Sequence, residues 1–107
     1  MITTLIVPNV TPGRPYPTNA LYLQALEARL CQEFGGFTAA QGQGGWREIS
    51  GRVICEPVTI YTIATYRPGD GDICTNFRDL AREIARDLEQ ECVYLSFSPG
   101  NAEFITP

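Results

Sequence analysis

The chain has 107 residues, 44% of them hydrophobic, and a formal net charge of −4, which indicates a single globular domain spanning 1–107. The acidic charge argues against nucleic-acid binding, because neutralising phosphates requires a basic face. The sequence contains neither histidine nor lysine, which excludes histidine-based triads, histidine metal ligands, Schiff-base chemistry and a Walker-type lysine within the chain.

The first predicted element is a strand over residues 2–7, ITTLIV, which is β-branched and apolar and ends at Pro8. We expect it at the centre of a sheet, since both of its faces can be buried. Residues 8–18 form a proline-rich loop that carries Arg14 and Tyr16. Loops of this length are often functional, so this one is either a solvated connection or the rim of a site.

A helix is predicted over about 19–34, with Thr18 or Asn19 as its cap and Gly35-Gly36 as its end. Its apolar residues recur at spacings of three or four and form one stripe, made of Leu23, Leu26, Leu30 and Phe34. This stripe indicates that one face of the helix packs against the sheet.

The stretch over 36–65 predicts one long β-hairpin, in which two strand-forming runs flank a turn at Ser50-Gly51. Counting outward from this two-residue turn sets the register. The predicted pairs are Trp46 with Cys55, Gly45 with Glu56 and Gly44 with Pro57. Proline cannot donate to a ladder and glycine weakens one, so we expect a bulge or bend at the last pair and an outer arm that leans away from the sheet.

The inner part of the second hairpin strand, 58–64, is apolar or β-branched throughout and predicts another central strand. Residues 66–75 are predicted to form a loop. Its two acids, Asp70 and Asp72, provide fewer oxygens than calcium requires.

A second helix follows this loop, with Thr75 or Asn76 as its cap. Its apolar face comprises Phe77, Leu80, Ala81, Ile84, Ala85 and Leu88. Residues 92–98 alternate as a half-buried strand does, and residues 102–105 add a short strand or pack on an edge of the sheet.

The order strand–helix–strand–strand–helix–strand is that of the ferredoxin-like split βαβ fold. We therefore predict an α+β domain with a four-stranded antiparallel sheet and both helices on one face. The other face would expose alternate residues such as Thr59, Tyr61 and Ile63. Because a large apolar surface seldom stays uncovered on a monomer, we expect a homodimer formed through sheet faces or hairpin arms.

The four cysteines, Cys31, Cys55, Cys74 and Cys92, include no C-x-x-C pair, so the usual zinc and thioredoxin spacings are missing. We expect free thiols, with Cys74 the best-placed nucleophile among them. No apolar run approaches the roughly 20 residues that span a bilayer, and the start MITTLIVP has no basic n-region. We therefore expect a cytoplasmic protein without membrane, metal or cofactor.

A binding site is expected where the hairpin meets the loop after the first strand, since both lie at one end of the predicted sheet. Glycine lets a ligand or backbone approach closely, tryptophan offers a stacking plane, and arginine can hold a carboxylate or phosphate. The predicted ligand- or partner-binding residues are Arg14, Tyr16, Gly44, Gly45, Trp46, Arg47 and Glu56. None of them is assigned a catalytic role.

The runs GFT (36–38), GQGGWR (42–47) and EPV (56–58), together with Gly51, resemble a group of small uncharacterised bacterial and phage proteins. In that group a helix leads into G-x-T, then G-x-G-x-W-R, then G and E, and then a helix and a strand. The resemblance covers about 20–97. It implies an α+β fold and transfers no catalytic residue.

Two functions fit these patterns. The first, which we favour from the sequence, is a non-catalytic accessory protein of a phage or mobile element that binds a small ligand or a host protein and acts on host defence. The second is a cofactor-independent enzyme of the dimeric α+β-barrel type. In that enzyme Glu56 or Glu48 would act as the base, with its pKa raised by burial, and Arg47 or Arg14 would hold an anionic substrate.

Overall fold

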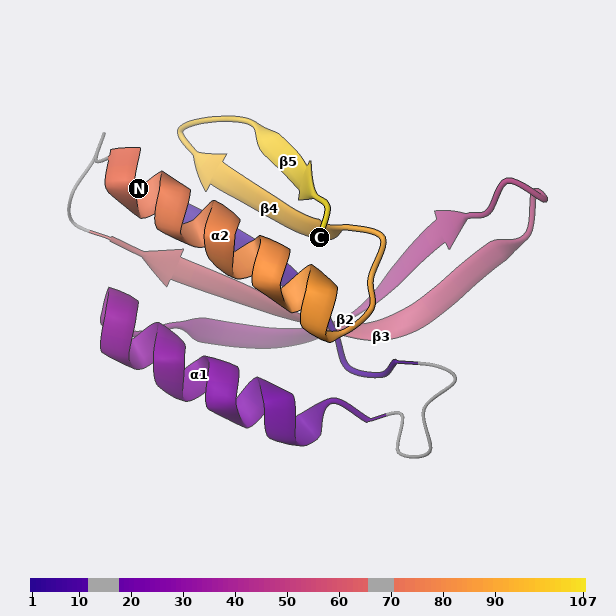
Figure 1. Ribbon diagram of the computed structural model, residues 1–107, viewed down its shortest axis with the longest axis horizontal. Coiled ribbons are helices and arrows are strands. Elements are labelled where there is room, and N and C mark those ends of the chain that lie inside the picture. Colours follow the sequence, from indigo (N-terminus) through magenta and orange to yellow (C-terminus); the bar gives the residue numbers. More distant parts are fainter. Residues whose placement is uncertain (12–17, 66–70) are drawn as a thin grey trace.

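The computed structural model describes residues 1–11, 18–65 and 71–107. Its elements, in chain order, are β1 (Ile2–Pro8), α1 (Ala20–Phe34), β2 (Thr38–Arg47), β3 (Val53–Ala64), α2 (Gly71–Asp87), β4 (Val93–Ser98) and β5 (Ala102–Ile105). The strands of this described part form one antiparallel sheet in the order β2-β3-β1-β4-β5. Figure 1 shows α1 and α2 running across one face of the sheet, and residues of both helices join the same core.

The core lies between the helices and one face of the sheet. Alternation along each strand places every second side chain in it: Leu5 and Val7 of β1 are fully buried, whereas Ile2 is 48% exposed. The helices supply the apolar stripes that their spacing predicts. The core residues of both layers are Leu5, Val7, Leu23, Leu26, Leu30, Tyr61, Ile63, Phe77, Leu80, Ala81, Ile84, Ala85, Leu88, Val93, Leu95, Phe97 and Ile105.

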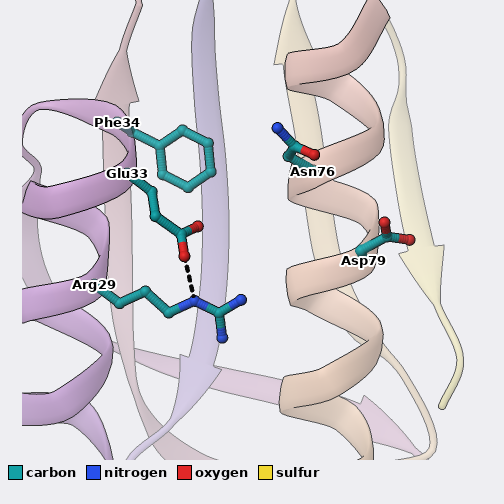
Figure 2. A pocket seen from close by; sticks show the side chains of 5 residues that line it. All are labelled: Arg29, Glu33, Phe34, Asn76 and Asp79. Atoms are coloured by element: carbon teal, nitrogen blue, oxygen red, sulfur yellow. Dashed lines mark hydrogen bonds and ion pairs between the residues drawn. The ribbon is translucent and has the colours of Figure 1, made fainter.

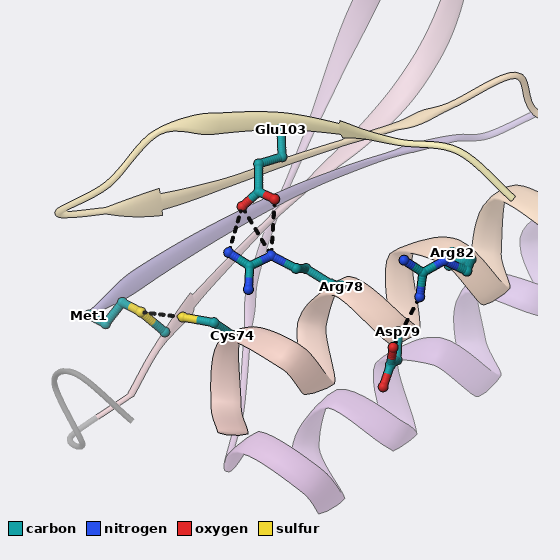
Figure 3. A network of polar contacts seen from close by, with 6 residues as sticks. All are labelled: Met1, Cys74, Arg78, Asp79, Arg82 and Glu103. Carbon is teal, nitrogen blue, oxygen red and sulfur yellow. Dashed lines mark hydrogen bonds and ion pairs between the residues drawn. The ribbon is translucent and has the colours of Figure 1, made fainter. Parts of the chain in front are cut away.

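The sheet has five strands where the sequence predicted four. The additional strand is β5, which pairs with β4 at the edge of the sheet. Figure 3 shows how it is held: Arg78 of α2 donates from Nε to Glu103 Oε1 and from Nη2 to Oε2, both at 3.0 Å. The same guanidinium lies 5.4 Å from the centre of the Phe97 ring. Four residues are too few for periodicity to predict a strand reliably. The position of β5 at the sheet edge depends on these contacts with α2 and β4.

The helix ends agree with the sequence at α1 and disagree at α2. Asn19 precedes α1, but its side chain makes no capping hydrogen bond, and the Thr18 hydroxyl accepts from the Ala20 amide instead. Gly35, in the left-handed conformation with φ of 92°, ends the helix. The second helix begins at Gly71, so the predicted caps at 75–76 lie inside it.

Two predicted loops fall partly outside the described residues. Residues 12–17 include Arg14 and Tyr16, and residues 66–70 include Asp70. The predicted loop over 66–75 is wrong in its second half, because α2 already begins at Gly71.

The sheet face turned away from the helices, called the open face below, differs from the predicted one. Thr59, Tyr61 and Ile63 are buried on the helix side. Residues 58–64 are apolar or β-branched throughout, so the sequence pattern did not fix which of their two faces the helices cover. The open face instead carries their neighbours, and its apolar members include Ile2, Ile6, Ile60, Tyr94 and Phe104.

No helix within the described residues is long and apolar enough to cross a membrane.

The two faces of α1 predict different responses to the same substitution. Leu30 is fully buried and Leu21 is 81% exposed. Leu30→Ala should lower the free energy of unfolding by about 2–5 kcal/mol, because it leaves a cavity in the core. Leu21→Ala should change it by less than about 0.5 kcal/mol. Urea denaturation followed by circular dichroism measures both, and equal effects would contradict the described packing of α1.

Candidate functional site

The β2–β3 hairpin extends beyond the rest of the sheet. Only the inner part of β3, from Val58 to Ala64, pairs with β1, whereas β2 and β3 pair with each other as far as Arg47 and Val53. Residues 43–57 therefore form a two-stranded hairpin arm, and Figure 1 shows it projecting past both helices. The expected arm is present, and no residue of its β2 strand is buried.

The tip of the arm sets a different register from the predicted one. The Glu48 amide donates to the Arg52 carbonyl, and the Gly51 amide donates to the Glu48 carbonyl. The loop therefore has three residues, and its last, Gly51, has φ of 90°, a conformation typical of three-residue hairpin loops. One extra loop residue shifts every pair by one: the observed partners are Trp46 with Ile54, Gly45 with Cys55, Gly44 with Glu56 and Gln43 with Pro57.

The predicted bulge at Pro57 is absent, and the ladder runs without interruption from Thr38 to Arg47. The Pro57 carbonyl accepts from the Asn9 amide on the β1 side, at 3.0 Å. In a strand, the N–H and C=O of one residue point the same way. The missing proline donor therefore faces away from β2, and the β2–β3 ladder loses no hydrogen bond.

The glycines of the arm make room for side chains of β3. A Cβ at Gly44 would lie 3.2 Å from Val58 Cγ1, and one at Gly42 would lie 3.1 Å from Ile60 Cδ1. Val58 is only 5% exposed, although it lies on the open face. The β3 side chains of Val58 and Ile60 therefore lie close to these glycines, and the binding role of Gly44 stays a prediction.

The observed register divides the predicted site between two faces of the arm. Trp46, Gly44 and Glu56 share the open face, because directly paired residues and every second residue point the same way. Gly45 and Arg47 lie on the opposite face. In the predicted register Trp46 and Glu56 would have been on opposite faces, so the three-residue loop is what brings them together.

Glu56 is a half-buried carboxylate, and no described residue forms an ion pair with it. Burial raises its pKa above the ordinary value for glutamate. Next to it on the open face are the half-buried Ile54 and Trp46, which is 44% exposed. Within one copy of the chain this surface is open rather than enclosed. It offers an aromatic plane and a carboxylate that can accept hydrogen bonds or attract a cation.

Other perturbed groups in the described part of the chain are already engaged. Burial raises the pKa of the Tyr22 and Tyr61 hydroxyls. The Tyr22 hydroxyl donates to Asp87 at 2.9 Å, and that of Tyr61 donates to Glu27 at 3.1 Å. These pairs link helix to helix and helix to sheet, which is a structural role.

A groove between the two helices is a concave feature of the described residues. Figure 2 shows that Arg29, Glu33 and Phe34 of α1 face Asn76 and Asp79 of α2 across it, and its volume is about 460 Å³. Its charges are mutually satisfied: Arg29 bonds to Glu33 and Glu83, and Asp79 bonds to Arg82. No cluster of three or more potential metal ligands occurs among the described residues. The groove therefore offers little free chemistry.

Sequence reasoning missed a polar cluster on the opposite face of the sheet, at the base of the arm. Asn9, Gln41 and Thr59 are hydrogen-bonded to one another there. Asn9 directly follows β1, where the sequence predicted only a proline-rich loop. Asn9, a polar residue immediately after a buried strand, was the signal in the sequence that could have indicated this cluster.

Comparison with solved structures gives two matches that cover 99% of this chain and 88% of theirs. One is a phage SAM lyase in complex with S-methyl-5′-thioadenosine, with a TM-score of 0.77 and 18% identity. The other is a phage SAM lyase in the apo state, with a TM-score of 0.72 and 17% identity. No protein-family model and no curated protein matches the sequence. At these identities the likeness establishes a shared fold.

This likeness contradicts the function favoured from the sequence. A non-catalytic accessory protein was predicted, whereas both structures that share the whole fold are of an enzyme. The resemblance to phage proteins is supported, since both neighbours are phage proteins. The hairpin motif on which that resemblance was based has no counterpart in a family model.

The raised pKa of Glu56 predicts a pH-dependent effect of replacing it. A carboxyl group whose pKa is higher in the folded state stabilises the fold fully below its unfolded-state pKa, about 4.3 for glutamate. That contribution is lost as the pH rises through the folded-state value. Glu56→Gln should therefore raise the thermal midpoint relative to the parent chain more at pH 7 than at pH 4.

Thermal denaturation at the two pH values measures this difference. Glu48→Gln is the matched control, because it removes the same charge from the exposed tip of the arm. A benefit of Glu56→Gln that is larger at pH 4 would contradict burial as the cause of the shift.

Proposed function

We propose that this chain is a lyase that cleaves S-adenosylmethionine and releases S-methyl-5′-thioadenosine. The observation that carries the proposal is the likeness over 99% of the chain to a SAM lyase whose structure contains S-methyl-5′-thioadenosine. The likeness extends from β1 to the C-terminal strand, so it includes the hairpin arm and the open face.

The chemistry of this reaction suits the composition of the chain. S-methyl-5′-thioadenosine keeps the methyl group, the sulfur and the adenosyl group, so the bond that breaks joins sulfur to Cγ of the methionine part. The sulfur leaves with the bonding electron pair as a neutral thioether and needs no proton. A general acid is therefore unnecessary, and the absence of histidine and lysine is no obstacle.

A lyase adds no water, so Cγ must complete its bonding from within the four-carbon fragment. The carboxylate of the same fragment can supply an oxygen to Cγ and close a five-membered ring. The protein then has to bind the substrate in a folded shape and favour the passage from a sulfonium to a thioether. Orientation of this kind supplies a large part of the rate enhancement in many enzymes.

We assign the substrate to the open face of the hairpin arm, where Trp46, Gly44 and Glu56 meet. Trp46 offers a plane for stacking adenine or for contact with the positively charged sulfonium. Glu56 has no ion-pair partner among the described residues, so its carboxylate is available to a cationic or hydroxyl-bearing ligand. Arg47 and Gly45 lie on the other face, and Arg14 and Tyr16 stay predicted rim residues.

A second copy of the chain is proposed to cover this surface. The arm exposes Trp46, Ile49 and Val53, and the open face exposes Ile2 and Phe104. An isolated two-stranded ribbon is marginally stable in water, and exposed apolar side chains of this size favour association. A homodimer is the simplest closed arrangement, and it would convert the open surface into an enclosed site.

The remaining assignments follow from the same observations. The strand order β2-β3-β1-β4 with two helices on one face supports a ferredoxin-like domain, extended by β5. Its four free thiols suit a reducing compartment, so we keep the cytoplasm as its proposed location and a phage as its proposed source.

The activity has a direct test. Incubating the purified chain with S-adenosylmethionine should release S-methyl-5′-thioadenosine, which liquid chromatography with mass spectrometry identifies. Trp46→Ala should lower kcat/KM by roughly 10-fold or more, since stacking on an aromatic side chain is worth about 1–3 kcal/mol. Leu21→Ala, on the exposed face of α1, is the control and should leave it unchanged. Absence of the product from the parent chain under all conditions would overturn the proposal.

Self-association has an independent test. Native mass spectrometry should show a dimer of the parent chain. Ile49→Asp, at the fully exposed arm tip, should shift it towards monomer, because it places a charge in the proposed contact. Leu21→Asp introduces the same charge on the exposed face of α1 and should not. A monomeric parent chain would refute self-association, and a larger closed assembly would refute the dimer alone.

A further inference from the structure

Three side chains from neighbouring segments close a ring of hydrogen bonds at the base of the hairpin arm. Asn9 donates from Nδ2 to Gln41 Oε1 at 2.7 Å, and Gln41 donates from Nε2 to Thr59 Oγ1 at 3.2 Å. Thr59 completes the ring by donating from Oγ1 to Asn9 Oδ1 at 2.5 Å. Each member donates once and accepts once, an arrangement in which the bonds strengthen one another.

The ring stands where the arm leaves the sheet. Gln41 and Thr59 are direct partners in the β2–β3 ladder, and Thr59 is also paired with Val7 near the end of β1. Two positions further out, Pro57 is no longer paired with any residue of β1. The ring therefore ties both strands of the arm to the last residue that continues β1.

Asn9 is itself held by the rest of the domain. Its backbone amide donates to the Pro57 carbonyl at 3.0 Å, and its carbonyl accepts from the Asn19 amide at 2.8 Å. The Asn19 side chain donates in turn to the Pro8 carbonyl and accepts from Thr11. Asn9 thus connects the start of α1 and the end of β1 to both strands of the arm.

Without the ring, few contacts would fix the orientation of the arm relative to the sheet. A two-stranded ribbon twists more freely than a sheet and has no third strand to fix it. Pro57, which bonds to Asn9, is the residue next to Glu56. A rotation of the ribbon at this point would displace Glu56 and, further out, Trp46. Loss of orientation at reacting groups is costly for a reaction that depends on substrate shape.

We propose that the ring of Asn9, Gln41 and Thr59 fixes the direction of the hairpin arm and thereby positions Glu56 and Trp46. Its members are positioning residues, since they lie on the opposite face of the sheet from the proposed substrate site. The catalytic part of this inference rests on the proposed lyase function. The conformational part, that the ring holds the arm, stands independently of it.

The exposure of the ring favours a positioning role over a simple contribution to stability. Thr59 is buried, but the contact between Asn9 and Gln41 is open to solvent. Water would satisfy these amides at little cost if the ring opened. The amides therefore do not need the ring to satisfy their hydrogen bonds, and what it adds is a fixed geometry.

Two pairs of matched variants separate geometry from stability. Thr59→Val removes the hydroxyl but keeps the shape and the strand preference of the side chain, whereas Thr59→Ser keeps the hydroxyl. Gln41→Ala removes a ring member, whereas Gln43→Ala makes the same change two positions along the same strand face. No side-chain hydrogen bond of Gln43 occurs within the described residues.

The first measurement does not depend on enzymatic activity. Amide hydrogen exchange of peptides covering 42–56 should be faster in Thr59→Val and Gln41→Ala by on the order of 10-fold, because local opening becomes easier. Time-resolved fluorescence anisotropy of Trp46, the only tryptophan, should show greater motion of the arm. Thr59→Ser and Gln43→Ala should match the parent chain in both measurements. An arm equally protected in all four variants would overturn the proposal.

The second readout is turnover of S-adenosylmethionine. kcat should fall by roughly 10-fold or more in Thr59→Val and Gln41→Ala, since a displacement of about 1 Å can cost about 100-fold, and Thr59→Ser should restore it. A loosened arm with unchanged kcat would overturn the positioning role. If the parent chain shows no turnover, the lyase proposal fails, and hydrogen exchange still decides whether the ring holds the arm.

Discussion

The architecture of this protein depends on a difference in length between neighbouring strands. β3 has 12 residues and pairs with β2 over ten positions, whereas β1 has only seven residues. Where β1 ends, the β2–β3 ladder continues alone and becomes the hairpin arm. The proline and the glycines are accommodated there without a bulge, because the missing proline donor faces away from β2 and the glycines receive β3 side chains.

The arm combines features that a stable isolated structure would avoid. It carries three exposed apolar residues, Trp46, Ile49 and Val53, and a half-buried carboxylate without an ion-pair partner among the described residues. Local departures from good packing and pairing often mark functional sites. The helix side of the sheet is better packed, since its core is closed and the Tyr22 and Tyr61 hydroxyls are bonded to carboxylates, and its buried departure among the described residues is the Thr3 hydroxyl, which has no hydrogen-bond partner there. Function is therefore better sought on the open face and the arm.

The proposed reaction requires little acid–base catalysis but depends strongly on the conformation in which the substrate is bound. Cleavage of a sulfonium releases a neutral thioether, so a chain without histidine or lysine can carry it out by orientation and electrostatics. The missing histidine would weigh against an enzyme only if the leaving group needed a proton. The likeness to a SAM lyase supplied the reaction in which it does not.

The sequence by itself predicted the elements from β1 to β4 and their order, because the apolar periodicity of α1, α2 and β4 and the β-branched, apolar composition of β1 are local signals. It also singled out Trp46 and Glu56, the residues now placed on one face. Tertiary structure alone decided which faces they share, since one additional loop residue at Gly51 shifts the whole register. It alone decided the short β5, which is held by Arg78 and Glu103, and the ring that joins Asn9 to Gln41 and Thr59. The strand and the ring depend on contacts between residues far apart in the chain, which a local pattern does not encode, whereas the register depends on a loop length that the Ser50-Gly51 signal did not fix.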